Sequence, residues 1–294
     1  MAKKVETVPM EFYDGAIKID FYPNSHRYKI VEEDGEAMKE WIPSPSSILN
    51  MLDKSGQLVH WAVNCFEEKM LELAGENPES VFSKDDLVSM ITEGKQAHTV
   101  KKDAAASVGS IVHAYAEQFS KEGKADLNAE DMEALEPADH QKVINGVASF
   151  HQWIEEAKPE FLKSEFSVMS RKQRFVGTSD ELANVYGGKY LLDYKTSKGV
   201  YTSHFYQASA YLKAYEEEHG EKLDGAIIAH IVKDDYTRKD GSVITAGSMG
   251  IATLSRADLV TGYQVFKALH TVYRLDKEVN KKIYASQTIQ YSQS

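Results

Sequence analysis

Two short segments near residue 180 constrain the fold most, because they place three charged side chains on a pair of β-strands. The first reads Gly177-Thr178-Ser179-Asp180, and the second contains Asp193-Tyr194-Lys195. Residues i and i+2 of a strand project to the same face, so Asp193 and Lys195 are expected side by side. The Gly187-Gly188 pair supplies a turn that folds one strand back on the other. We therefore expect Asp180 to end the first strand and all three charges to converge at one sheet edge.

Such a convergence is unfavourable in a folded protein unless another charge compensates it. Desolvating carboxylates and an ammonium group costs free energy that only close partners offset. A metal ion or an anionic substrate would provide that compensation. The pattern therefore predicts metal-dependent chemistry on a phosphodiester.

A helix predicted over 101–122 carries a second pattern. Its buried stripe consists of five apolar residues at helical spacing, namely Val108, Ile111, Val112, Tyr115 and Phe119. Gly109, His113 and Glu117 lie at i, i+4 and i+8 on a different face. Glycine in mid-helix costs about 0.5–1 kcal/mol relative to alanine, so Gly109 indicates close approach of a backbone or a ligand. Taken alone, His113 is best explained as an exposed polar residue.

Gln207 and Tyr211 form a third pattern on the helix that follows the lysine strand. They are four residues apart, so the amide and the phenol share one face, and Tyr215 extends it. Taken alone, this pattern fits a helix whose tyrosines pack on the sheet.

Together, these motifs resemble the signature of the RecB-type branch of the PD-(D/E)XK nuclease superfamily. They occur in the order Gly109-x-x-x-His113-x-x-x-Glu117, Gly177-Thr178-x-Asp180, Asp193-Tyr194-Lys195-Thr196 and Gln207-x-x-x-Tyr211. The resemblance spans roughly residues 105–215, and the N-terminal segment is similar to stand-alone phage and mitochondrial exonucleases of this branch. No proline precedes Asp180, and the second acid is Asp193; neither departure affects the chemistry.

The resemblance implies roles for particular residues. His113, Asp180, Asp193 and the backbone carbonyl of Tyr194 would bind one or two Mg²⁺ or Mn²⁺ ions. Hard cations prefer the carboxylate and carbonyl oxygens of this set, and the imidazole of His113 suggests that Mn²⁺ is also well tolerated. Lys195 would orient or deprotonate the attacking water, or stabilise the transition state. The remaining candidates are substrate-binding residues or indirect contributors to the metal site: Gln207, Tyr211, Arg171 and Arg174 for the substrate, and Glu117 and Glu165 near the metal.

The expected fold is α/β, with a restriction-endonuclease-like mixed sheet flanked by helices and a helical N-terminal half. We expect one domain over 1–294, with a hairpin and helical lobe over 1–100, a core over 101–285 and a polar tail over 286–294. The sequence predicts a hairpin in 18–42 and a helix that is capped by Ser46 or Ser47 and runs to Trp61. A capping box at Ser83–Asp86 opens another helix, and further helices are predicted over 57–75, 101–122, 139–158, 202–219 and 255–284. The predicted strands are 161–170, 174–186, 189–196, 225–233 and 243–253.

Composition excludes several classes of function. The net charge of −11 argues against a passive nucleic-acid coat protein, although a basic groove can be local. A single cysteine, Cys65, excludes an iron–sulfur cluster held by one chain, and the absence of a phosphate-binding Gly-x-x-x-x-Gly-Lys loop argues against ATP use. No apolar run is long enough to span a membrane, and no signal peptide is evident, so we expect a cytoplasmic protein of a bacterium or phage-infected host.

The preferred interpretation is a metal-dependent deoxyribonuclease that removes nucleotides from free DNA ends. An endonuclease of the same fold, a catalytically idle DNA-end-binding module and a metal-binding protein without a nucleic-acid substrate are the alternatives. The resemblance also implies a recombination setting, in which a single-strand-annealing or recombination protein is a candidate partner. The sequence does not predict polarity, strand preference, activity on RNA or oligomeric state.

Overall fold

A mixed five-stranded sheet forms the centre of the molecule. The computed structural model describes residues 6–75, 81–238 and 240–285, so the predicted tail 286–294 lies outside the described residues. The strand order is β11-β8-β7-β6-β5, and β7 pairs with β8 in parallel while the other pairs are antiparallel. The strands are β5 (Glu160–Ser170), β6 (Phe175–Val185), β7 (Gly188–Lys195), β8 (Gly225–Ile231) and β11 (Met249–Leu254). The predicted α/β class with a mixed, helix-flanked sheet is confirmed.

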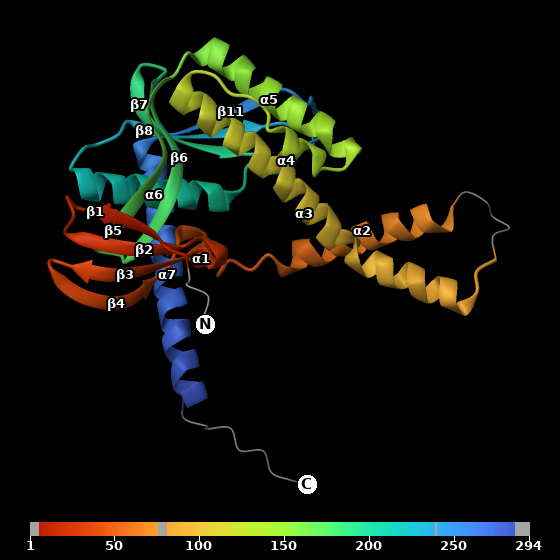
Figure 1. Ribbon diagram of the computed structural model, residues 1–294, viewed down its shortest axis with the longest axis horizontal. Helices are drawn as coiled ribbons and strands as arrows, with labels where there is room; N and C mark the ends of the chain where they lie inside the picture. The colour runs from red at the N-terminus through yellow and green to blue at the C-terminus, as the bar shows by residue number, and fades with distance from the viewer. Residues whose placement is uncertain (1–5, 76–80, 239, 286–294) are drawn as a thin grey trace, which may run out of the picture.

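Helices cover both faces of this sheet (Figure 1). On one face α6 (Thr202–His219) and α7 (Arg256–Ala285) bury Leu191 of β7. On the other face α3 (Lys84–Glu122) and α5 (Pro137–Ala157) bury Leu192 and Tyr194 of the same strand. A strand that is buried on both faces has no polar side, which explains the continuous apolar run in β8.

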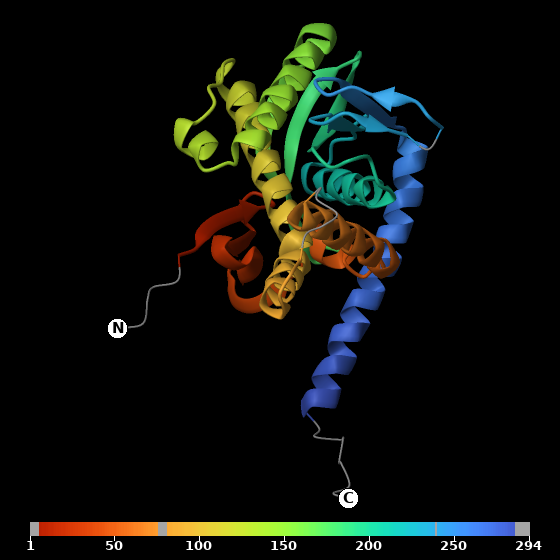
Figure 2. The same cartoon turned by 90° about the vertical axis from the view of Figure 1, so that its right-hand side faces the viewer.

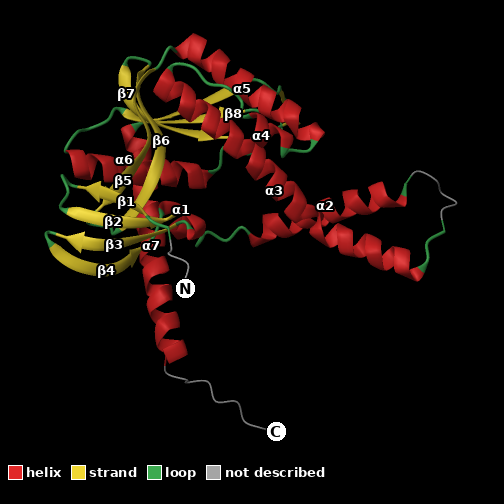
Figure 3. Cartoon of the chain, viewed as in Figure 1, coloured by secondary structure: helices red, strands yellow, loops and turns green. Residues whose placement is uncertain are grey.

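Residues 8–42 form a second sheet, antiparallel and four-stranded, that packs beside the first (Figure 3). Its strands are β1 (Val8–Phe12), β2 (Ile17–Tyr22), β3 (Arg27–Glu33) and β4 (Glu36–Ile42). The predicted hairpin corresponds to β3 and β4, and β1 and β2 extend it. Its inner face buries Met169 and Val176 of the central sheet, and the Val176 amide donates to the Pro43 carbonyl at 3.1 Å.

The predicted helix from Ser46 or Ser47 to Trp61 is wrong, because two helices occupy this region. Ser44 caps the short α1 (Pro45–Leu49), where its hydroxyl accepts from the Ser47 amide at 3.2 Å. The chain then leaves the helical path, and Asp53 accepts from the Ser55 amide at 2.8 Å as α2 (Ser55–Ala74) begins. A carboxylate that accepts from the backbone two residues ahead favours such a turn over a continuous helix.

The predicted helix 101–122 is the second half of α3, which is 39 residues long. Its first turn has the predicted capping box between Ser83 and Asp86. The first half of α3 and α2 lie against each other and project from the body as an arm (Figures 1 and 2). The predicted boundary at residue 100 falls inside this continuous helix.

The remaining short elements are η1 (Pro23–Ser25), α4 (Ala129–Glu133), β9 (Tyr236–Thr237) and β10 (Val243–Ile244). The predicted strand 243–253 is therefore divided between β10 and β11. In the part of the chain that the structure describes, no helix combines the length and hydropathy that a bilayer crossing requires.

Candidate active site

Asp180 and Asp193 meet on two interior strands of the central sheet. Asp180 lies in the middle of β6, so the expectation that it ends the strand is wrong, and neither β6 nor β7 is an edge strand. One Asp180 oxygen, Oδ2, accepts a hydrogen bond from the Tyr194 amide at 2.6 Å. This bond fixes the Asp180 carboxylate against β7, next to Asp193.

Asp193 and Lys195 form a buried ion pair, as the two-residue spacing predicted. The Lys195 Nζ lies 2.5 Å from the Asp193 Oδ2, and the two side chains are 18% and 3% exposed. Burial, with the like charge of Asp180, raises the pKa of Asp193, although Lys195 opposes the change. Burial alone would lower the pKa of Lys195, but its two carboxylate neighbours outweigh burial and raise that pKa. One ammonium group thus balances two carboxylates.

His113 reaches this pair of strands from α3. Its Nδ1 lies 3.8 Å from the Asp180 Oδ2, and its ring meets the Tyr194 ring edge-on with centroids 6.2 Å apart. The close approach of α3 requires Gly109, since a Cβ there would lie 2.7 Å from the Thr196 Oγ1. The mid-helix glycine therefore reflects contact with a side chain at the end of β7.

Gln207 and Tyr211 cover the site from α6. The Gln207 Nε2 donates to the Tyr211 hydroxyl at 2.9 Å, and burial raises the pKa of that phenol. Gly177 makes room for the ring, because a Cβ at Gly177 would lie 2.9 Å from the Tyr211 Cε1. All four sequence motifs therefore come together around β6 and β7.

Three further glutamates lie near Asp180. Glu165, at a positive φ of 45°, is half-buried, and burial together with the charges of Asp180 and Glu117 raises its pKa to about 7. Glu117 forms an ion pair with Lys121 on the helix surface. Sequence analysis missed Glu181, whose side chain is buried and accepts from the Ser164 hydroxyl at 3.1 Å. Its burial raises its pKa to about 8.

His204, in the first turn of α6, is another residue that sequence analysis missed. Burial, followed by the charge of Lys195, lowers the pKa of its imidazole to about 4. Its Nδ1 accepts from the Tyr201 amide at 3.3 Å. The only sequence signal was its position three residues before Gln207 on the same helix face.

Arg171 and Arg174 bind carboxylates of the N-terminal sheet. Arg171 pairs with Glu33 at 3.0 Å and with Asp34, while Arg174 pairs with Glu33 at 3.0 Å and with Glu40. The structure therefore gives both arginines a role in holding the two sheets together. Their predicted contact with substrate stays a prediction.

The side chains around Asp180 and Asp193 decide whether a divalent cation fits at this site. In the described ranges, no group of three or more His, Cys, Asp or Glu side chains forms a metal-ion site. Mg²⁺, however, usually binds one or two carboxylates and keeps several waters. Asp180 and Asp193 meet that smaller requirement, and the buried Asp193 Oδ2 accepts no hydrogen bond of regular geometry despite its ion pair. The residues present therefore fit a hydrated cation better than a protein-enclosed one.

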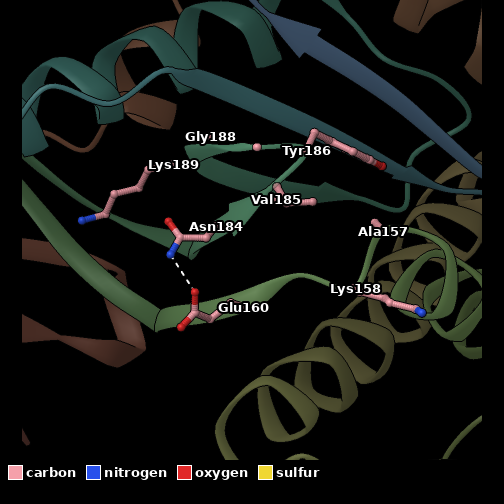
Figure 4. A pocket seen from close by; sticks show the side chains of 9 residues that line it. Ala157, Lys158, Glu160, Asn184, Val185, Tyr186, Gly188 and Lys189 are labelled. Atoms are coloured by element: carbon pink, nitrogen blue, oxygen red, sulfur yellow. Dashed lines mark hydrogen bonds between the residues drawn. The ribbon is translucent and has the colours of Figure 1, made fainter.

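A hollow on the surface lies away from these residues. It has a volume of about 520 Å³ and lies beside the β6–β7 turn, between Tyr186–Lys189 and the end of α5 (Figure 4). Asn184 on its wall donates to Glu160 at 2.7 Å. None of the predicted site residues lines it, so this hollow is separate from the candidate active site.

Comparison with known proteins gives only distant similarities. No protein-family model matches the chain, and no curated protein sequence matches it. The solved structures that it resembles include a "Putative exonuclease" from Eubacterium rectale, with 15% identity, 60% of this chain and 70% of that chain covered, and a TM-score of 0.35. Another is the protein SSO0001, with 12% identity, 72% and 86% covered, and a TM-score of 0.25. Neither similarity assigns the chain to a family.

Proposed function

We propose that this chain is a metal-dependent deoxyribonuclease that hydrolyses phosphodiester bonds at DNA ends. The observation that carries the proposal is the convergence of Asp180, Asp193 and Lys195 within a buried part of the sheet. Structural packing does not require two carboxylates and a lysine at this depth, and replacing such ionic groups by apolar residues is often neutral or stabilising. Their retention is better explained by chemistry.

Asp180, Asp193 and the Tyr194 carbonyl would hold Mg²⁺ or Mn²⁺, with His113 beside Asp180. Bound there, the cation would lower the pKa of a water molecule and neutralise charge on the scissile phosphate. No ATP and no iron–sulfur cluster enter the proposal.

Lys195 would act mainly through its positive charge. Its raised pKa keeps the side chain protonated, so it suits donation to a phosphate oxygen or to the attacking water better than proton abstraction. The ion pair with Asp193 holds the ammonium group in place. Gln207 and Tyr211 would orient the DNA backbone through the amide and hydroxyl that they already align.

Replacing Lys195 tests the proposal directly. Lys195→Ala should lower cleavage of linear DNA by about a hundredfold or more, because one charge that stabilises the transition state is lost. Binding of DNA, measured by fluorescence anisotropy in a chelating buffer, should change little. Lys189→Ala is the matched control, since Lys189 lies on the same strand but pairs with Glu221 at 2.6 Å. Undiminished cleavage by Lys195→Ala would overturn the proposal.

A further inference from the structure

The outer face of the N-terminal sheet carries a cluster of aromatic and basic side chains. Strand alternation buries Tyr28, Ile30 and Ile42 against the core. It turns Arg27, Lys29 and Trp41 outward. Trp41 is 45% exposed although it is a tryptophan, a residue that is rarely so accessible without a partner.

The aromatic and basic members of this cluster touch one another. The Arg27 guanidinium lies 4.1 Å above the Trp41 ring, and the Lys29 Nζ lies 5.7 Å from it. The ring of Tyr22, on β2 across β3 from Trp41, lies 5.0 Å from the Trp41 ring. We call these four residues the outer platform. With these neighbours in place, Trp41 is still 45% exposed.

The outer platform is locally basic in a chain of net charge −11. Within residues 6–75, 81–238 and 240–285, neither Arg27 nor Lys29 forms an ion pair with a carboxylate, although Asp20 lies opposite Lys29 in register. Arg171 and Arg174, at the inner side of the same sheet, have carboxylate partners. Uncompensated cations next to exposed rings suit a ligand with both negative charge and flat apolar faces.

The outer platform is also physically linked to the candidate active site. Tyr28, which follows Arg27, faces Thr178, two residues from Asp180. Pro45, four residues after Trp41, contacts the backbone at Gly177, where a Cβ would lie 3.0 Å from the Pro45 Cδ. Four residues span at most about 14 Å, so the backbone of Trp41 lies within that distance of Pro45.

We propose that the outer platform binds single-stranded DNA that enters or leaves the active site. The inference rests on the proposed function for the identity of the ligand. Bases stack on aromatic side chains only when they are unpaired, because a duplex hides the faces of its bases. Arg27 and Lys29 provide the phosphate contacts, and Trp41 with Tyr22 provides the stacking surface.

The experiment measures binding of fluorescein-labelled oligo-dT to the full chain by anisotropy in a chelating buffer, so that cleavage does not interfere. Trp41→Ala should weaken binding about tenfold, whereas Trp41→Phe should keep most of the affinity. The double variant Arg27→Ala/Lys29→Ala should reduce the slope of log affinity against log salt by about 1.4, the value for two charges on a single strand. Affinity for a blunt duplex should change much less.

Lys277→Ala is the matched control, because Lys277 makes the same kind of contact, 5.0 Å from the Tyr273 ring, on α7. It should bind oligo-dT like the unmodified protein. Unchanged oligo-dT affinity and salt slope in folded Trp41→Ala and Arg27→Ala/Lys29→Ala proteins would overturn the inference, as would an equal loss for duplex DNA. Because these measurements involve no cleavage, they are separate from the Lys195 test of the proposed function.

Discussion

Individual side chains in the candidate site are held in ionisation states that water alone would not give them. Glu165 and Glu181 are pushed toward the neutral acid by burial, whereas the two carboxylates that face Lys195 reinforce its ordinary charged state. Glu181 has the clearest consequence for stability, because its Oε2 is buried and accepts no hydrogen bond.

Glu181→Gln should therefore stabilise the protein increasingly as pH rises. Burial raises the pKa of Glu181 from 4.5 to about 8 in the folded state, so between these values the folded state binds more protons than the unfolded state. The contribution of Glu181 to the free energy of unfolding is then lost as the pH rises from about 4.5 to about 8. We therefore expect the difference in free energy of unfolding between Glu181→Gln and the unmodified protein to increase by on the order of 3 kcal/mol over this pH range.

Urea unfolding at pH 4.5, 6.5 and 8.5 in a chelating buffer measures this difference. Glu67→Gln on the exposed surface of α2 is the control. A constant difference between Glu181→Gln and the unmodified protein across the three pH values would contradict the assignment.

For single residues, local sequence rules predicted some members of the candidate site and could not predict others. Asp193 and Lys195 are two residues apart on one strand, so strand geometry places their side chains on the same face. The partners of Arg171 and Arg174 lie more than 130 positions away in sequence, so no local pattern links them. Glu181 escaped prediction because its burial depends on the packing of other elements around it, including Ser164 of β5.

The contact between α3 and the end of β7 brings His113 to Asp180. Gly109 sets this distance, because its missing side chain lets the helix approach Thr196. The same helix continues outward into the arm with α2, so one element connects the site to the periphery of the molecule.

Gly109→Ala should destabilise the protein by about 1–2 kcal/mol and lower cleavage, since the added Cβ forces α3 away from Thr196. Adding Thr196→Ala should restore most of the stability, because it removes the Oγ1 that lies 2.7 Å from the added Cβ. Gly56→Ala is the control, as nothing lies within 4 Å of a Cβ there. Thermal unfolding of the unmodified protein, the two single variants, the double variant and the control measures the coupling. Additive effects of Gly109→Ala and Thr196→Ala would contradict this account.

Element prediction succeeded where periodicity and end signals agree. The bounds of α6, 202–219, match the structure because Gly220 ends the helix in a left-handed conformation, with its amide bonded to the Glu216 carbonyl. The region 46–61 was predicted wrongly because a short helix, a turn and a second helix share one run of helix-compatible residues. The full length of α3 was missed because the exposed arm has a weaker apolar pattern than the buried half.

At the scale of the whole molecule, two sheets and an arm surround the candidate site. The central sheet carries Asp180, Asp193 and Lys195, and the N-terminal sheet is tied to it by Arg171 and Arg174 and by a shared core. The order of motifs predicted this convergence, whereas the four-stranded sheet beside the site was predicted only as a hairpin. A nuclease interpretation requires that these parts act together on DNA.

The most direct measurement is cleavage of end-labelled linear single- and double-stranded DNA beside a covalently closed circle, with Mg²⁺, Mn²⁺ or a chelator. We expect metal-dependent loss of the linear DNA only, with no such loss for Lys195→Ala. Cutting of the closed circle would contradict action at DNA ends and indicate an endonuclease. Absence of cleavage on every substrate and with both metals would contradict the central claim that Asp180, Asp193 and Lys195 form a nuclease site.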